Sequence, residues 1–139
     1  MANKNKENIV ELYKQAISAF NNRDIEKEIN FFAEDYVDHF NKISGRDELR
    51  QFVDVYIKAF PDIKRTIEDI LVEGNKVANR YRVKGIHQGE FMGIAPTGKK
   101  VEVNGIVISR FEDGLIAEEW DLWDTDSFLK QLGLKEFPV

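Results

Sequence analysis

Residues 101–123 read VEVNGIVISRFEDGLIAEEWDLW, and this stretch decides the fold. Apolar and polar side chains mostly alternate along it, which is typical of β-strands that bury one face. Glu112-Asp113-Gly114 interrupts the alternation with residues that favour turns. The stretch therefore predicts two strands, over 101–111 and 115–123, that are joined as a hairpin.

The same pattern begins upstream of this hairpin. Alternation starts at Ile63, and Glu73-Gly74-Asn75-Lys76 predicts a tight turn before a return strand over 77–87. Residues 89–100 are punctuated by glycine and proline and predict a loop. We therefore expect four long strands linked into a curved antiparallel sheet.

The first half of the chain predicts helices. A single apolar stripe indicates a helix of roughly four turns, and it consists of Ile9, Leu12, Tyr13, Ala16, Ile17 and Phe20. Asp24 is expected to cap a second, short helix that buries Ile25, Ile29 and Phe32. A third helix is expected to start at Ser44-Gly45 and to end at Pro61.

Two short elements complete the prediction, a strand over 36–40 and a helix over 126–132. Helices followed by hairpin-linked strands indicate the α+β class rather than alternating βαβ units. Helices packed on the concave face of such a sheet would leave a cone with an open mouth, which can hold a ligand. We expect a single domain over 1–139.

The composition limits the classes of function. The net charge is −5 with both signs interspersed, which disfavours a nucleic-acid partner, and there is no cysteine for disulfides or thiol catalysis. Neither a signal peptide nor a membrane-spanning apolar run is present, so we expect a cytoplasmic protein. His39 and His87 form no helical ligand pair, and the sequence does not indicate a metal site.

Two carboxylates in the last strand carry the strongest chemical signal. Glu119 and Asp121 lie two residues apart on one face of a strand that also contains two tryptophans. If that face is dry, burial and the neighbouring Glu119 raise the pKa of Asp121, which makes it a candidate general acid or base. If the face is wet, the two carboxylates only add solubility.

A two-residue turn at Asp113-Gly114 would fix the partners of these carboxylates. It predicts Ile108 opposite Glu119 and Ile106 opposite Asp121, and it brings Arg110 one diagonal step from Glu119 as a salt-bridge partner.

The same construction around Gly74-Asn75 pairs Asp69 with Arg80 across the preceding hairpin. An ordinary cross-strand ion pair is the simplest role for that pair.

Other candidates are more ambiguous. His87 ends a strand, where it would orient a substrate oxygen or only bond to a loop carbonyl. His39 alternates with apolar neighbours, and the adjacent Asp38 points to the other face, so a catalytic pair is not implied. Core packing and pocket lining explain the aromatic candidates equally well; these are Tyr13, Phe60, Phe91 and Trp123.

An ordered set of motifs resembles the SnoaL-like polyketide cyclases, a family of the nuclear-transport-factor-2-like superfamily. The motifs span most of the chain and end in Gln131-Leu132-Gly133; the others are Ala59-Phe60-Pro61-Asp62-Ile63, Glu73-Gly74-Asn75-Lys76-Val77, Gly85-Ile86-His87-Gln88-Gly89-Glu90, Gly93-Ile94-Ala95-Pro96-Thr97-Gly98-Lys99 and Glu118-Glu119-Trp120-Asp121.

The resemblance implies a cone-shaped α+β barrel that forms a homodimer through its outer sheet face and works without a cofactor. It also implies an aldol-type cyclisation in which Asp121 is the acid/base residue, with His87 as a second catalytic group and Asn104 as a polar wall. Glu119 stands where the family often has a histidine.

We therefore expect a cyclase or isomerase that acts on a small carbonyl compound, polyketide-like or an ester. The expected catalytic residues are Asp121 and His87, and the expected substrate-binding residues are Glu119, Asn104, His39, Tyr13, Phe60, Phe91 and Trp123. A non-catalytic protein that binds a small apolar ligand is the alternative. A third hypothesis is a structural role in which Ile116, Trp120 and Leu122 form a dimer face.

Overall fold

The computed structural model describes residues 2–138, with side chains from residue 8 onward. Its elements follow the order α1 (Ala2–Asn21), α2 (Ile25–Ile29), β1 (Phe32–Asp38), β2 (Ile43–Ser44), α3 (Gly45–Ala59), β3 (Lys64–Glu73), β4 (Lys76–Ile86), β5 (Lys100–Glu112), β6 (Leu115–Trp123) and α4 (Thr125–Gln131). The helices precede the long strands, as the periodicity of the sequence predicts.

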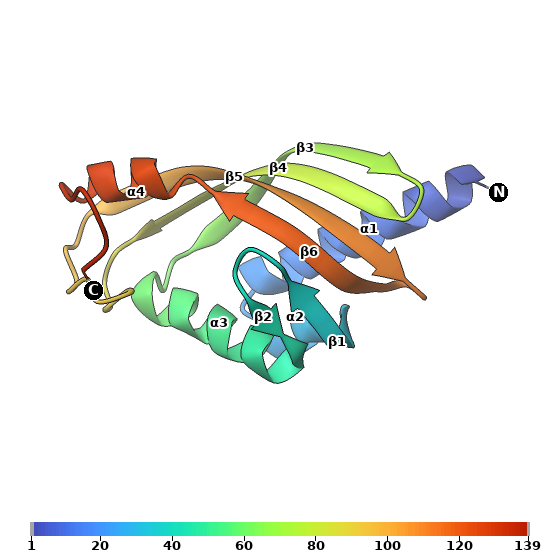
Figure 1. Ribbon diagram of the computed structural model, residues 1–139, viewed down its shortest axis with the longest axis horizontal. Helices are drawn as coiled ribbons and strands as arrows, with labels where there is room; N and C mark the ends of the chain where they lie inside the picture. The colour runs from blue at the N-terminus through green and yellow to red at the C-terminus, as the bar shows by residue number, and fades with distance from the viewer. Residues whose placement is uncertain (1, 139) are drawn as a thin grey trace.

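One curved sheet contains all six strands in the order β2-β1-β6-β5-β4-β3. The sheet arches over α1, α2 and α3, which lie on its concave side (Figure 1). The predicted α+β class and the curved sheet with helices on its concave face are confirmed. One pairing departs from the antiparallel pattern, because β1 runs parallel to β6. No hairpin joins these two strands, so nothing in the connection imposes the antiparallel direction.

The first half differs from the prediction in two details. Phe32 begins β1 instead of lying in the second helix, so the strand covers Phe32–Asp38 rather than 36–40. Asp24 occupies the N-cap position of α2, but its side chain makes no capping hydrogen bond.

The β5–β6 hairpin has the predicted turn but not the predicted register. Asp113 and Gly114 both have positive φ, 52° and 78°, as a two-residue type I′ turn requires. A β-bulge then shifts the register between Arg110 and Phe111, so that Phe111 pairs with Ile116 but Arg110 pairs with Glu118. The extra residue on β6 leaves both Ile116 and Ala117 buried.

The bulge overturns the predicted partners of the two carboxylates. Ser109 lies opposite Glu119 and Val107 lies opposite Asp121, where Ile108 and Ile106 were expected. Arg110 consequently bonds to Glu118 at 2.6 Å and not to Glu119. A one-residue shift in register reverses which face each partner occupies, so the shift also changes the chemistry around Glu119.

The β3–β4 hairpin follows its prediction. Asp69 pairs with Arg80 in the register and as an ion pair of 2.8 Å. Both side chains are largely exposed on the convex face, so the pair is an ordinary surface contact.

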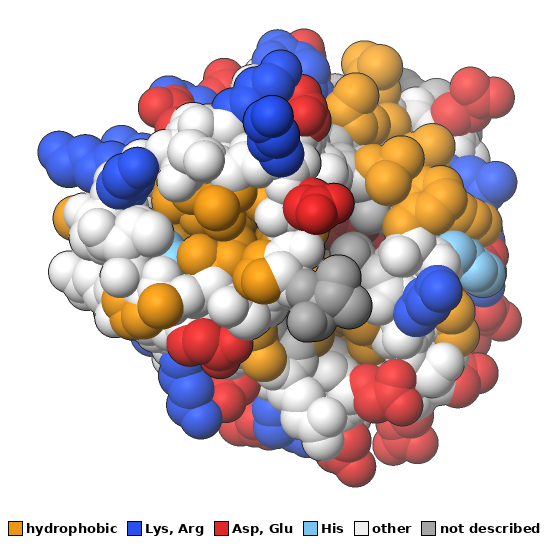
Figure 2. Space-filling view, turned by 60° about the vertical axis from the view of Figure 1, so that its left-hand side comes forward, with side chains coloured by type: hydrophobic (Ala, Val, Ile, Leu, Met, Phe, Trp, Pro, Cys, Tyr) orange, Lys and Arg blue, Asp and Glu red, His pale blue; other side chains and the backbone are white. Residues whose placement is uncertain are grey.

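The surface carries hydrophobic patches as well as charge. Figure 2 turns the end of the molecule that bears α4 toward the viewer and shows hydrophobic side chains gathered between charged ones. No helix among the described residues has the length and apolar character needed to cross a membrane.

Candidate active site

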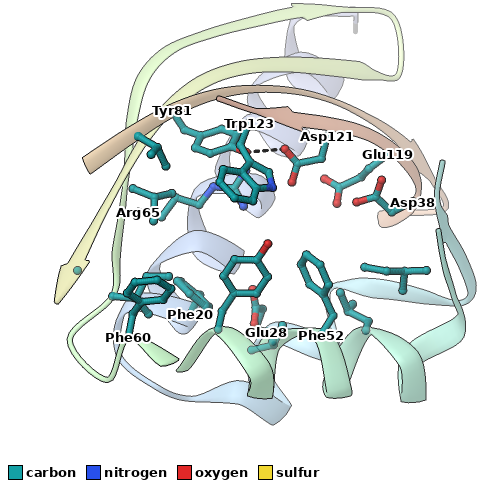
Figure 3. Close-up of a pocket in the computed structure, with 18 of the residues that line it drawn as sticks. Phe20, Glu28, Asp38, Phe52, Phe60, Arg65, Tyr81, Glu119, Asp121 and Trp123 are labelled. Carbon is teal, nitrogen blue, oxygen red and sulfur yellow. Dashed lines mark hydrogen bonds between the residues drawn. The ribbon is translucent and has the colours of Figure 1, made fainter. Parts of the chain in front are cut away.

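A cavity of about 130 Å³ lies between the concave face of the sheet and helices α2 and α3 (Figure 3). Its walls are mostly aromatic and aliphatic, and they include Phe20, Phe32, Phe52, Tyr56, Phe60, Ile63, Val83, Phe91, Val101, Val103, Trp123 and Phe128. A dry apolar cavity of about 150 Å³ holds one benzene molecule. The site therefore suits a small ligand with an apolar or aromatic body.

Asp121 brings a carboxyl group into this apolar cavity from β6. The hydroxyl of Tyr81 donates a 2.6 Å hydrogen bond to Oδ1 of Asp121. Burial raises the pKa of Asp121, while the charge of Arg65 and the Tyr81 hydrogen bond both act to lower it. Burial dominates, so the Asp121 carboxylate is a stronger base than an exposed aspartate.

Tyr81 reaches Asp121 across an intervening strand. Tyr81 lies on β4 and Asp121 on β6, and Gly105 of β5 pairs directly with Tyr81. A Cβ at residue 105 would lie 2.3 Å from the Tyr81 hydroxyl oxygen, so any side chain there would displace the phenol. Glycine at this position lets the tyrosine ring lie flat over β5.

Glu119 is buried beside Asp121 and is fully engaged by hydroxyl groups. Tyr36 donates to its Oε1 at 2.6 Å, and Ser109 makes a short hydrogen bond to its Oε2. Burial and the charge of Asp121 raise the pKa of Glu119 to about 7, against the opposing hydrogen bonds. The Glu119 carboxyl therefore takes up its proton near neutrality and is held in place on both oxygens.

Sequence reasoning did not place four charged residues in the cavity lining, which are Glu28, Asp38, Arg65 and the exposed Lys84. Burial raises the pKa of Glu28 to about 8, and its Oε1 has no partner among the described residues. Asp38 accepts hydrogen bonds from the backbone of Phe40 and from Asn41. The only sequence signal for Arg65 is that it shares a strand face with the apolar residues Ile63 and Ile67.

The carboxyl groups of the cavity wall are not arranged as the ligands of a metal ion. Among the described residues, no three His, Cys, Asp or Glu side chains are arranged to hold a metal ion.

His87 lies outside the wall of the cavity. It is fully buried, its ring packs 5.4 Å from that of Phe60, and its Nδ1 lies 3.0 Å from the Thr97 hydroxyl oxygen. Burial lowers its pKa, so the imidazole stays neutral near pH 7. The geometry therefore suits a residue that holds the 89–100 loop, and it does not bring His87 to Asp121.

The remaining predicted residues divide between cavity, core and outer surface. Phe60, Phe91 and Trp123 line the cavity, whereas Tyr13 is buried in the core and accepts a 2.7 Å hydrogen bond from Asn79. His39 stacks on Trp120 and bonds to Glu118 at 2.7 Å, away from the cavity. Asn104 is exposed on the convex face beside Ile106.

The sequence model described as SnoaL-like polyketide cyclase matches residues 10–132. No curated protein sequence matches the chain.

Several solved structures have the same fold as the chain and are also similar to it in sequence. AclR from Streptomyces galilaeus, described as a candidate hydroxylase, is 31% identical with a TM-score of 0.83, over 92% of this chain and 97% of its own. IdmH from Streptomyces antibioticus, described as a candidate polyketide cyclase, is 31% identical with a TM-score of 0.78, over 91% and 99%. TsrD from Streptomyces laurentii is 26% identical with a TM-score of 0.85, over 92% and 96%. The different descriptions of these relatives are consistent with one fold that hosts several activities.

Proposed function

The chain belongs to the SnoaL-like polyketide cyclase family, and we propose that it is a cyclase- or isomerase-type enzyme that acts on a small carbonyl compound by acid/base catalysis. Asp121 is the general base in this proposal. The observation that carries it is the position of a carboxyl group with a burial-raised pKa in the wall of an aromatic cavity.

The proposed step is removal of a proton from the carbon next to a carbonyl group. Asp121 Oδ1 already accepts from Tyr81, while Oδ2 accepts from no described residue and is free to take the proton. The resulting enolate can attack a second carbonyl of the same molecule, which closes a ring, or can be reprotonated elsewhere, which isomerises it. Both outcomes need the same base and the same water-poor cavity.

Glu119 has a supporting role in this proposal. Both of its oxygens are held by hydroxyl groups, so neither is directed to a substrate. The charge of Asp121 helps to raise the pKa of Glu119, and protonation of Glu119 removes a negative charge from beside the proposed base.

Deuterium exchange tests this proposal without knowledge of the natural substrate. Phenylacetone is a small aryl ketone with enolisable hydrogens, and its exchange in D₂O can be followed by NMR. Asp121→Asn should reduce the protein-catalysed exchange by about 100-fold or more, because it removes a general base. Asp113→Asn removes an exposed carboxylate at the β5–β6 turn and should leave the exchange rate unchanged. Equal rates in wild type and Asp121→Asn, with the fold intact, would contradict the proposal.

A second candidate is a protein that binds a small apolar ligand without turnover. It is favoured by the largely aromatic wall and by the hydrogen bonds that hold Asp121 and Glu119. Affinity for phenylacetone without measurable exchange in the wild type would support this candidate over the enzyme.

We further propose that the protein forms a homodimer through the convex face of the sheet. An outer apolar strip crosses β5 and β6 and consists of Phe40, Ile106, Ile108, Trp120 and Leu122. Four of these side chains are between 41% and 58% exposed. Lys76 and Arg80 lie at the β4 edge of the strip, and a second copy turned about a two-fold axis would place the two strips against each other as a shared apolar centre.

A further inference from the structure

Arg65 brings a guanidinium group to the cavity that the acid/base step does not use. The guanidinium carbon lies 3.8 Å from the centre of the Tyr81 ring, in a stacked contact. Among residues 8–138 no side chain or carbonyl accepts a hydrogen bond from this guanidinium, and its Nε is buried without a partner. A buried donor without a hydrogen-bonding partner is costly, and the rest of this guanidinium lines the cavity, so the geometry points to a group that the ligand supplies.

The backbone of Arg65 is held in place by the helix beneath it. Nδ2 of Asn21 donates to the Arg65 carbonyl at 2.8 Å, and the Arg65 amide donates to Asn21 Oδ1 at 2.9 Å. Arg23 fixes the preceding turn through the carbonyls of Pro61 and Ile63, at 2.8 and 2.6 Å. Two hydrogen bonds from Asn21 thus fix the Arg65 backbone, and two from Arg23 fix the turn before β3, so the Arg65 side chain extends from a rigid backbone.

Tyr81 links this cation to the proposed base. One face of its ring contacts Arg65, and its hydroxyl donates to Asp121. Asp121 and Arg65 therefore lie on either side of one rigid phenol, both in the cavity wall (Figure 3). A ligand that reaches both groups must have a proton to lose and an oxygen to bind within the span of one small molecule.

We propose that Arg65 binds the carbonyl oxygen of the substrate and stabilises the enolate that forms when Asp121 removes the neighbouring proton. The substrate class is thereby narrowed to compounds whose enolisable carbon is attached to a carbonyl that points at the guanidinium. This inference rests on the proposed function of Asp121, and the two are tested separately below.

The charges balance in this step. The C–H bond breaks, its electron pair forms the C=C bond of the enolate, and the carbonyl π pair moves to oxygen. The proton goes to the Asp121 carboxylate. The number of negative charges in the cavity is unchanged, and the charge moves from Asp121 to an oxygen held by Arg65. A guanidinium is suited to this role because it stays charged and donates to oxygen anions through a planar fork.

The other carboxyl groups that face the cavity oppose this charge only weakly below neutrality. Glu119 and Glu28, with pKa values of about 7 and about 8, are protonated there. Asp38 already accepts hydrogen bonds from the Phe40 amide and from Asn41. The exposed Lys84 is a second cation of the cavity lining.

The test uses 4-nitrophenol, whose ring fits the cavity and whose anion resembles an enolate. Its absorbance reports directly whether the bound molecule is the phenol or the phenolate. At pH 6 the wild type should bind it as the phenolate, with the proton held by Asp121. Arg65→Gln should bind it as the neutral phenol, with affinity lower by roughly tenfold to a hundredfold, the value of a charge-assisted hydrogen bond. Arg65→Lys should keep part of the phenolate signal.

The matched control is Arg82→Gln, which removes an arginine that pairs with Glu68 and Glu102 outside the cavity, and it should leave the bound spectrum unchanged. The inference is overturned if wild type binds the neutral phenol, or if Arg65→Gln retains the phenolate spectrum. If Arg65→Gln fails to fold, the wild-type and Arg65→Lys spectra decide.

Asp121→Asn separates this inference from the proposed function. It should still bind the phenolate, more tightly than wild type, because the amide removes a negative charge from the cavity. Loss of that binding would count against the arrangement around Arg65. Unchanged deuterium exchange in Asp121→Asn would contradict the role of Asp121, whatever the spectrum of the bound phenol.

Discussion

The hydroxyl of Tyr81 donates to Asp121 Oδ1 at 2.6 Å across the whole width of strand β5. The contact joins two strands that are not neighbours in the sheet. It also connects the half-buried guanidinium of Arg65 with Asp121, whose Oδ2 accepts no hydrogen bond from the described residues. Both oxygens of Glu119 and both oxygens of Asp38 accept hydrogen bonds. The proposed acid/base reaction therefore depends on the position of one phenol ring.

Tyr81→Phe should move the pH dependence of deuterium exchange toward alkaline pH. The Tyr81 hydrogen bond lowers the pKa of Asp121, so its removal raises that pKa further. Exchange requires the Asp121 carboxylate, so its rate rises with pH as Asp121 ionises. This rising limb of the pH–rate profile should therefore move to higher pH in Tyr81→Phe. The pH–rate profile measures this shift. Tyr56→Phe also changes a tyrosine of the cavity wall but removes no hydrogen bond to Asp121, and it should leave the limb in place. A shift of equal size in both variants would contradict the assignment.

Gly105→Ala should disturb the hydrogen bond between Tyr81 and Asp121 by pushing against the Tyr81 ring from strand β5. The new Cβ would lie 2.3 Å from the Tyr81 hydroxyl oxygen, so the ring must move or the strands must separate. Overpacking of this kind costs about 1–3 kcal/mol of unfolding free energy. Denaturant unfolding measures the cost, and the exchange profile should shift in the direction predicted for Tyr81→Phe.

A double-mutant cycle identifies the cause of that cost. In a Tyr81→Ala background the ring is absent, so Gly105→Ala should cost much less than it does in the wild type. Equal costs in the two backgrounds would show that the glycine is needed for a reason other than Tyr81.

The sequence predicts the elements of the site better than its chemistry. Alternation along 115–123 places Asp121 and Glu119 on one strand face, and Trp123 follows on that face of the cavity. The bulge next to Ala117 could not be predicted, because neither glycine nor proline marks it and because Ile116 and Ala117 are both apolar. That one residue exchanged the expected Arg110 partner of Glu119 for Ser109.

Glu28 and Arg65 escaped prediction for a different reason. Glu28 lies in the sequence Glu26-Lys27-Glu28, and Arg65 follows Lys64, so both resemble solvent-exposed charges. Their positions depend on long-range packing of α2 and β3 against the rest of the curved sheet and its helices, which local periodicity does not contain. Asn104 is the opposite case, a residue predicted at the site that lies outside it. Its alternation with the buried Val101 and Val103 already directs it to the convex face.

Glu28→Gln should make the protein less sensitive to rising pH. The pKa of Glu28 rises from 4.5 to about 8 on folding, so the folded state binds the proton more tightly than the unfolded state. Its contribution to stability is complete below pH 4.5 and is lost as pH rises toward 8, by at most about 1.4 kcal/mol per pH unit. The neutral amide loses nothing in this range, so the variant should gain on the wild type between pH 5 and pH 8.

Unfolding in denaturant at a series of pH values measures this gain. Part of the wild-type slope should remain in the variant, because the Glu119 pKa of about 7 has the same sign of effect. Glu26→Gln is the matched control, since Glu26 is an exposed glutamate of the same helix that pairs with Arg50. It should not alter the slope above pH 5. A wild-type slope in Glu28→Gln would show that Glu28 is not the group that titrates.

Ile106→Glu should convert the proposed dimer into a monomer. Ile106 is 56% exposed at the centre of the outer apolar strip, where it pairs with Leu122 on the neighbouring strand. In a two-fold dimer one substitution places a charge on both sides of the interface, and the two like charges must be desolvated together. Val55→Glu changes an equally apolar, exposed residue on α3, on the other side of the sheet, and should leave the dimer intact.

Sedimentation velocity separates the monomer from the dimer. A wild type that sediments as a monomer would contradict the dimer, and an Ile106→Glu variant that remains dimeric would show that the partner binds elsewhere. The cavity lies on the concave face, so the monomeric variant should keep the deuterium exchange and the bound phenolate spectrum of the wild type.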